Sequence, residues 1–310
     1  MTEFNNRVFG CAVVKAINSN YNADFSGQPR TLPNGVVYAT DKAYKYTIKN
    51  YFKDVYKDET IFYFKSLNKQ LNPISLDETY QKYFGDYPKE KGKPAKAAVV
   101  KNLLSCLDIR LFGATFAGKD VNISIHGTVQ VNHGVNIWKE NNIFSEQITS
   151  PFANKAGDAD AEKGMTTIGR QSRLEEGHYL HHFSVNPSNL ATVAALVENA
   201  PTVSADDIAK LKEAMQRGAT WYDSASKAGC ENEMLIWVQL KENSKIVLPN
   251  FTTLITLEEK TENRKYVYDF SGLKAELERI GNEIEKIEIY YNQQACRLKN
   301  LPAGTIEIDL

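Results

Sequence analysis

The residues best suited to hold a ligand lie in one stretch, residues 164–187 (GMTTIGRQSRLEEGHYLHHFSVNP). Its first half combines glycines and hydroxyl side chains with two arginines, Arg170 and Arg173. Arginine forks match the geometry of phosphates and also stack on bases, so this half could bind a phosphorylated ligand. An ordinary solvated hairpin has a similar composition, and these residues alone favour that second interpretation.

The second half of the stretch contains a histidine cluster, His178, His181 and His182. In a strand, residues 178 and 182 share a face while residue 181 points away, so the three cannot ligate one ion. We therefore expect no metal site and no cofactor, and a histidine that is either internally satisfied or turned toward a ligand. Asp24 could act as a base or position an ion, but a lone aspartate in a loop is usually a turn former.

A lysine stripe is the next candidate for ligand binding. Thr40 and Asp41 predict the start of a helix that runs to about residue 56. Residues 1–57 contain eight Lys or Arg against four Asp or Glu, which suggests a polyanionic partner. At helical spacing, four lysines fall on the face opposite the apolar residues and have no partner at i,i+4: Lys42, Lys45, Lys49 and Lys53.

Apolar patterns predict the elements that must position these residues. We expect strands at 7–17, 121–132, 177–185, 233–241 and 285–291, a hairpin at 251–257 and 265–270, and helices at 41–56, near 95–106, at 204–227 and at 273–280. We expect little regular structure at 57–101, a loop at 164–176, and a mobile excursion across 133–176. The order strand–helix–strands–helix–strand indicates an α+β fold of the ferredoxin-like or RNA-recognition-motif class, an antiparallel sheet with helices on one side.

Composition limits the function classes. The 310 residues carry a net charge of −1, so a basic site must be local. The four cysteines form no CxxC pair, and no apolar run reaches membrane-spanning length. The N-terminus has no signal-peptide pattern, so we expect a soluble, cytoplasmic protein. Nucleotide-binding and hydrolase motifs such as GxxxxGK[ST] and GxSxG do not occur.

Five short motifs follow one another along the chain. They are residues 18–24 with Pro29-Arg30, then Thr40-Asp41 with Lys45 and Lys49, then residues 108–114 (DIRLFGA), then Gly127-Thr128-Val129-Gln130, and finally residues 166–170 (TTIGR) followed by Gly177-His178-Tyr179. In this order they resemble the backbone subunit of type I CRISPR effector complexes, the seventh family of CRISPR-associated proteins within the RAMP superfamily. The resemblance extends over about residues 7–241.

The resemblance implies a single domain over 1–310 that is built on a palm similar to an RNA-recognition motif. A finger-like insertion (58–107), a thumb (135–176) and a C-terminal strand–helix–strand extension (242–310) would complete it. The implied function is non-catalytic. Copies of the chain, with other Cascade subunits, would line a CRISPR guide RNA and present it for pairing with target DNA; type I-B is the expected subtype, and no membrane is involved.

The lysine stripe, Arg170 and Arg173 would hold phosphates, and Met165 and Ile168 would wedge against bases. We expect these residues to contact RNA: Asn20, Arg30, Lys42, Lys45, Lys49, Gln130, Met165, Thr166, Thr167, Ile168, Gly169, Arg170, Arg173 and His178. The alternative is a RAMP endoribonuclease that uses a histidine, or a loop aspartate with a metal ion. A small-molecule enzyme of ferredoxin-like fold has no convergent polar cluster to support it.

Overall fold

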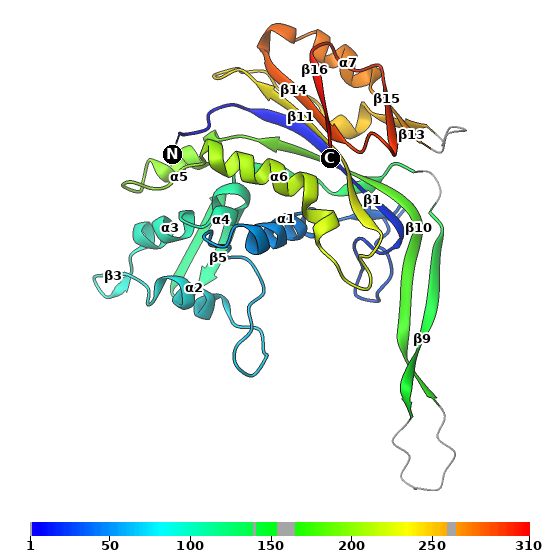
Figure 1. Ribbon diagram of the computed structural model, residues 1–310. Helices are drawn as coiled ribbons and strands as arrows, with labels where there is room; N and C mark the ends of the chain where they lie inside the picture. Colours follow the sequence, from blue (N-terminus) through cyan, green and yellow to red (C-terminus); the bar gives the residue numbers. More distant parts are fainter. Residues whose placement is uncertain (1, 139–140, 154–164, 259–264) are drawn as a thin grey trace, which may run out of the picture.

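The computed structural model describes residues 2–138, 141–153, 165–258 and 265–310 (Figure 1). Within these residues a nine-stranded sheet runs through the molecule. Its strands follow the order β16 (Thr305–Asp309), β14 (Ile284–Tyr291), β11 (Cys230–Leu240), β1 (Val8–Ser19), β10 (Met165–Val185), β8 (Gly134–Asn136) and β2 (Tyr38–Ala39), while β7 (Val129–Val131) and β9 (Ile143–Ala153) also pair with β10.

Strand β1 is the centre of this sheet. It is apolar and β-branched, and it is buried along nearly its whole length between β10 and β11, both antiparallel to it. The pairing is antiparallel elsewhere too, except at one edge, where β14 and β16 are parallel. The expected mixture of helices with a mainly antiparallel sheet is confirmed.

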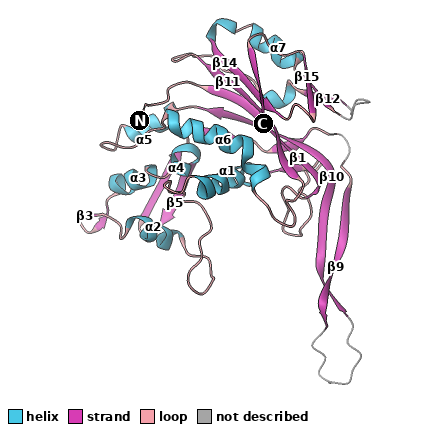
Figure 2. Cartoon of the chain, in the orientation of Figure 1, coloured by secondary structure: helices cyan, strands magenta, loops and turns pink. Residues whose placement is uncertain are grey.

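Helices α1 (Asp41–Val55) and α6 (Ala205–Trp221) cover one face of the sheet (Figure 2). The Thr40 hydroxyl caps α1 by accepting the Ala43 amide, and Ser204 with Asp207 forms a capping box at α6. Both helices bury an apolar stripe against the strands, as the helical period predicts.

The opposite face is covered by the C-terminal layer. A cluster around Ile236, Phe251 and Phe270 joins it to the sheet. A helix on each face corrects the expectation of helices on one side only. The elements of the layer are η1 (Phe251–Thr253), β12 (Thr256–Glu258), β13 (Tyr266–Asp269), α7 (Ser271–Glu278), η2 (Gly281–Glu283) and β15 (Cys296–Lys299).

A small lobe with its own apolar cluster, around Phe62, Tyr80 and Phe116, lies beside the helices. Its residues 57–101 were expected to have little regular structure, but they contain α2, which was not predicted and begins at a Ser75–Glu78 capping box. The lobe contains α2 (Leu76–Phe84), β3 (Lys89–Glu90), β4 (Lys93–Pro94), α3 (Lys96–Leu104), α4 (Leu107–Phe112), β5 (Gly113–Gly118), β6 (Val121–His126) and α5 (Ser188–Ala194).

The motif at residues 108–114 joins the small lobe to the rest of the molecule. The buried Asp108 carboxylate accepts the amides of Phe62 and Tyr63, both at 2.8 Å. Arg110 forms a two-pronged ion pair with Asp207 of α6, at 3.0 and 2.7 Å. Both side chains therefore have structural partners.

The predicted strand at 121–132 is wrong as a single element. It divides at Gly127 into β6 of the small lobe and β7 of the central sheet. A side chain at Gly127 would collide with the backbone of Phe112 and Gly113, so only glycine allows this close crossing. No helix in the described part of the chain is long and apolar enough to span a membrane.

Candidate nucleic-acid interface

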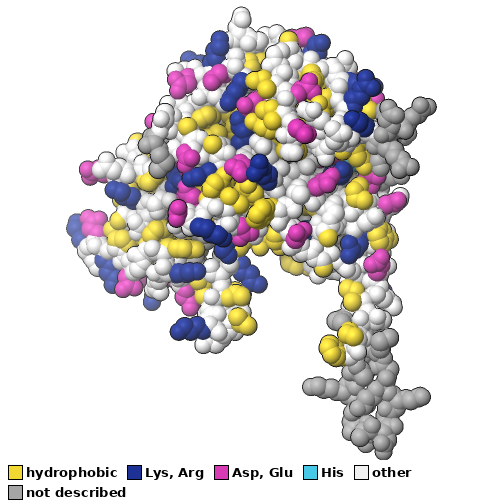
Figure 3. Space-filling model, viewed as in Figure 1, with side chains coloured by type: hydrophobic (Ala, Val, Ile, Leu, Met, Phe, Trp, Pro, Cys, Tyr) yellow, Lys and Arg dark blue, Asp and Glu magenta, His cyan; other side chains and the backbone are white. Residues whose placement is uncertain are grey.

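The hairpin of β9 and β10 extends away from the body of the molecule (Figure 3). The predicted loop at 164–176 is therefore wrong for the described residues 165–176, which are paired strand. These residues are polar and contain glycine, so they lack the alternation of apolar and polar residues that predicts a strand. Their backbone groups bond to β9, a partner that local sequence does not reveal.

The register assigns side chains to two faces of the hairpin, because directly opposite residues share a face. Ser145 pairs with Ser172 and Gln147 pairs with Arg170, so these four side chains share one face, which we call the loop face. The neighbouring pair of Phe144 and Arg173 lies on the reverse face.

The base of the hairpin is tied to the body. Arg173 donates to the carbonyls of Asn18 (2.8 Å) and Ala225 (3.3 Å), so its guanidinium is engaged with protein. Asn20 donates to the carbonyls of Gly27 and Ser172, both at 3.1 Å. Asn20 is buried and connects the first loop to the hairpin in this structure, and its contact with RNA stays a prediction.

Gly169 and Arg170 are exposed on the hairpin beyond this anchored base. Arg170 therefore presents a cation where a ligand can approach. The side chains of four further predicted contacts lie outside the described residues, although their backbone belongs to β10: Met165, Thr166, Thr167 and Ile168.

The first loop, residues 20–40, lies against the loop face. Lys227 donates to the carbonyls of Asn20 (2.8 Å) and Tyr21 (2.6 Å), and Gln28 donates to Ser145 at 3.4 Å. Arg30 is half-buried, and its Nε donates to the Ala23 carbonyl at 3.1 Å. This loop and the hairpin thus form one connected surface that carries Arg30 and Arg170.

Asp24 organises a tight turn in this loop. Its Oδ1 accepts the Ser26 hydroxyl and the amides of Ser26 and Gln28 at 2.7–3.0 Å. The Ser26 hydroxyl and these amides lower the pKa of Asp24. The geometry therefore confirms that Asp24 forms a turn, as expected.

The lysine stripe on α1 is less uniform than predicted. Lys42 and Lys45 both pair with Asp41 at 3.4 Å, and the Lys42 side chain is exposed while that of Lys45 is not. The Asp41–Lys45 pair has i,i+4 spacing, so the expectation of no such partner is wrong. Lys49 donates to the Tyr63 carbonyl at 2.8 Å, and burial lowers its pKa. Lys53 lies 4.5 Å from the Phe64 ring. Of the four, Lys42 and Lys53 are exposed, and Lys45 and Lys49 are partly buried.

His178 has no exposed surface in this structure, and its contact with RNA stays a prediction. Its Nδ1 donates to Glu233 at 2.5 Å and its Nε2 to Glu176 at 3.3 Å. Burial opposes the charged imidazole, yet Glu233 and Glu176 raise the pKa of His178 above its ordinary value. The predicted alternation is confirmed: His178 and His182 face the C-terminal layer, and His181 faces α1.

Gln130 is exposed beside a polar hollow of about 460 Å³ between the small lobe and the sheet. Its amide donates to the Gly127 carbonyl at 2.9 Å. Asn189 donates to the same carbonyl at 3.0 Å, and His126 also lines the hollow. The hollow is the second polar surface that a nucleic acid could reach.

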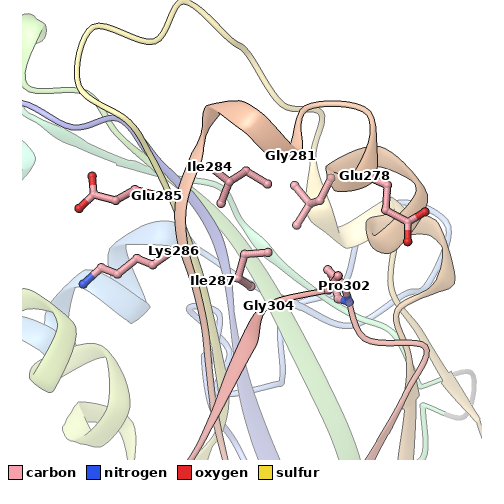
Figure 4. Close-up of a pocket in the computed structure, with 10 residues that line it drawn as sticks. Glu278, Gly281, Ile284, Glu285, Lys286, Ile287, Pro302 and Gly304 are labelled. Carbon is pink, nitrogen blue, oxygen red and sulfur yellow. The ribbon is translucent and has the colours of Figure 1, made fainter.

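A different hollow of about 370 Å³ lies in the C-terminal layer, lined by Ile284, Ile287 and Pro302 (Figure 4). Glu278 and Glu285 lie in its wall with one lysine, Lys286, so acidic side chains outnumber basic ones around it. Among the described residues no group of three or more His, Cys, Asp or Glu side chains could hold a metal ion.

These features define a mixed α/β protein with a projecting, arginine-bearing hairpin. The family model of CRISPR-associated protein Cas7 matches residues 6–278. The chain therefore belongs to the CRISPR-associated protein Cas7 family, and the family predicted from the five motifs is confirmed.

One solved structure shows a similar fold at low identity. A chain of a "CRISPR RNA-guided surveillance complex, pre-nicking" is 13% identical with a TM-score of 0.56, covering 98% of this chain and 96% of that chain. A chain of a "CRISPR RNA-guided surveillance complex" is also 13% identical, with a TM-score of 0.46 and coverages of 95% and 96%. No curated protein sequence matches this chain significantly.

Proposed function

We propose that the chain is a non-catalytic, guide-RNA-binding backbone subunit of a type I CRISPR complex, of subtype I-B, acting in the cytoplasm. Copies would assemble along the guide RNA with other Cascade subunits and leave its bases free to pair with target DNA. Membership of the Cas7 family supports the class of complex. The observation that carries the binding role is the anchored hairpin with its exposed Arg170 beside the first loop.

The strand order supports a palm similar to an RNA-recognition motif. The first, second, third and last strands of that core would be β1, β8, β10 and β11, with α1 and α6 as the crossing helices. The small lobe would be the finger and the β9–β10 hairpin the thumb. Because the C-terminal layer covers the sheet face opposite these helices, RNA would follow the hairpin and first loop and not the open sheet of a bare RNA-recognition motif.

Phosphate binding without base reading suits a guide carrier, since the guide's bases must remain free. We assign this contact to Arg170 of the hairpin and to Lys42 of α1, both of which are exposed. Arg173 would position the hairpin through its bonds to Asn18 and Ala225. Lys49 would hold the small lobe through Tyr63.

The test is the salt dependence of binding to single-stranded RNA, measured by fluorescence anisotropy for the full chain. Arg170→Ala and Lys42→Ala should each weaken binding equally on unrelated sequences. Each should also lower the log–log salt slope by about 0.7 per lost phosphate contact. Arg279→Ala, which removes an exposed arginine from the end of α7, is the matched control and should change neither quantity. Unchanged slopes in both test variants would show that these cations do not bind the backbone.

A ribonuclease of the same superfamily is the alternative. Incubation of the wild-type chain with labelled precursor RNA and Mg²⁺ separates the two functions. We expect intact RNA. If the wild-type chain cleaves the RNA and Asp24→Asn does not, the chain is a nuclease and our proposal is wrong.

A further inference from the structure

The turn at residues 24–28 holds an aromatic ring in water. Phe25 has a relative exposure of 105%, the highest among the large hydrophobic side chains of the described residues. Burial of such a ring would be favourable, so its complete exposure leaves it available to a ligand outside this chain.

The turn that carries the ring is rigid. Asp24 accepts three hydrogen bonds from Ser26 and Gln28, and its own amide donates to the Gln28 carbonyl at 2.8 Å. Gly27 has φ +82°, a conformation that favours glycine. The Asn20 side-chain amide donates to the Gly27 carbonyl at 3.1 Å. The ring is therefore presented by a fixed backbone, which lowers the entropy lost when a ligand binds.

The surroundings of the ring are cationic and polar. The Arg30 guanidinium carbon lies 5.9 Å from the ring centroid. Through Gln28 and Asn20 the turn contacts Ser145 and Ser172 of the hairpin's loop face. Arg170 lies on that same face, two residues or about 7 Å further out.

An aromatic face with Arg30 beside it and Arg170 on the adjoining loop face of the hairpin fits single-stranded nucleic acid. Bases stack on aromatic rings, while arginines hold the adjoining phosphates. Phenylalanine offers no hydrogen bond to a base edge, so such a contact does not select sequence. A hydrophobic protein partner could also bury the ring, but it would make no favourable contact with Arg30 and Arg170.

We propose that Phe25 is a base-stacking residue of this chain, and that one base of the bound RNA lies on its ring while Arg30 and Arg170 hold the neighbouring phosphates. The proposal rests on the RNA-binding function proposed above. It adds an uncharged stacking contact with the face of one base, and this contact does not select sequence.

The experiment compares Phe25→Ala, Phe25→Leu and Phe25→Trp on the shortest RNA that a single copy retains in a length series, with 2-aminopurine placed in turn at each position. Stacking contacts removed by alanine correspond to binding about 5- to 150-fold weaker. We expect this loss for alanine and most of it for leucine, with near wild-type binding for tryptophan. The salt slope should stay unchanged, and the wild-type quenching of 2-aminopurine at one position should disappear.

Leu196→Ala removes another exposed apolar side chain, 79% exposed, and is the control that should leave binding intact. Equal affinity of the wild type, Phe25→Ala and Phe25→Leu would overturn the stacking role while RNA binding itself stands. A loss seen only on RNA long enough for several copies would also overturn it, and would assign Phe25 to a contact between copies. Absence of RNA binding by the wild type would instead refute the proposed function.

Discussion

At the scale of single residues, His181 shows how the core controls ionisation. Its ring stacks on Tyr44 at 4.7 Å between centroids, its Nδ1 donates to the Asn132 carbonyl at 3.0 Å, and its Nε2 accepts the Tyr21 hydroxyl at 3.3 Å. Gly134 leaves the space that the ring occupies. Burial lowers the pKa of His181 to about 4, so the imidazole is neutral in the folded chain.

This burial predicts acid sensitivity. The unfolded chain takes up a proton near pH 6.5 and the folded chain only near pH 4, so folding loses free energy as the pH falls through this window. The loss due to His181 is about 3 kcal/mol in total, from roughly 1.4 kcal/mol per pH unit. Urea denaturation from pH 7 to pH 4 measures it.

The matched variant is His181→Gln, which retains hydrogen-bonding groups but does not titrate. It should be less stable at pH 7, and its unfolding free energy should decline less steeply toward pH 4. Parallel profiles for the two proteins would mean that His181 does not cause the acid sensitivity. The raised pKa of His178 acts in the other direction and at higher pH, since its contribution is complete below pH 6.5 and is lost as the pH rises through its folded value.

At the scale of elements, the hairpin divides into an anchored base and a projecting end. Leu174 is the residue of β10 nearest the tip that belongs to the sheet's apolar cluster, while Gly169 and Arg170 are exposed. On the opposite strand β9, Ile148, Thr149 and Phe152 are exposed as well, so these side chains add little to the folded core.

A shortened hairpin tests this division. Joining Ile148 to Gly169, which face each other in the register, through a two-residue Asn-Gly turn keeps the strand pairing. We expect the unfolding free energy to change by less than about 1 kcal/mol and RNA affinity to fall. Circular dichroism in urea and anisotropy measure the two effects.

Leu174→Ala provides the contrast, because truncating a fully buried leucine costs about 2–5 kcal/mol. A shortened hairpin that is as unstable as Leu174→Ala would show that the removed segment supports the fold. If the shortened hairpin binds RNA with wild-type affinity, the end of the hairpin does not belong to the RNA interface.

At the scale of the whole molecule, a buried ionic cluster joins the sheet to the C-terminal layer. Glu233 of β11 accepts His178 of β10 at 2.5 Å and the Tyr268 hydroxyl of β13 at 2.7 Å. Lys15 of β1 pairs with Glu231 and contributes to lowering the pKa of Glu233, where burial opposes ionisation but His178 and Lys15 prevail. One carboxylate thus holds two layers together.

Removal of that carboxylate should loosen the C-terminal layer. Glu233→Ala leaves His178 and Lys15 without their buried counter-charge, which predicts a loss of about 3–5 kcal/mol of unfolding free energy. Glu231→Ala removes a glutamate that is 43% exposed, so its loss should stay within about 1 kcal/mol. Differential hydrogen exchange should also show faster exchange in β13 of Glu233→Ala. Equal stability of the two variants would contradict this role.

Local physics made much of this protein predictable from its sequence. Helices α1 and α6 follow from an apolar period and from caps at Thr40 and Ser204, signals that lie within one turn of the helix they start. Alternation in β10 correctly separated His181 from His178 and His182. The family followed from five short motifs in order, each with only a few residues.

Tertiary structure alone decided the character of the site, because the partners are far apart in the chain. Asn20 donates to the Ser172 carbonyl, and Lys49 donates to the Tyr63 carbonyl. His178 donates to the Glu233 carboxylate. None of these pairings leaves a periodic or local trace in the sequence. The hairpin strand at 165–176 likewise exists because β9 supplies its hydrogen bonds, and a polar, glycine-rich segment has no apolar pattern to announce such a partner.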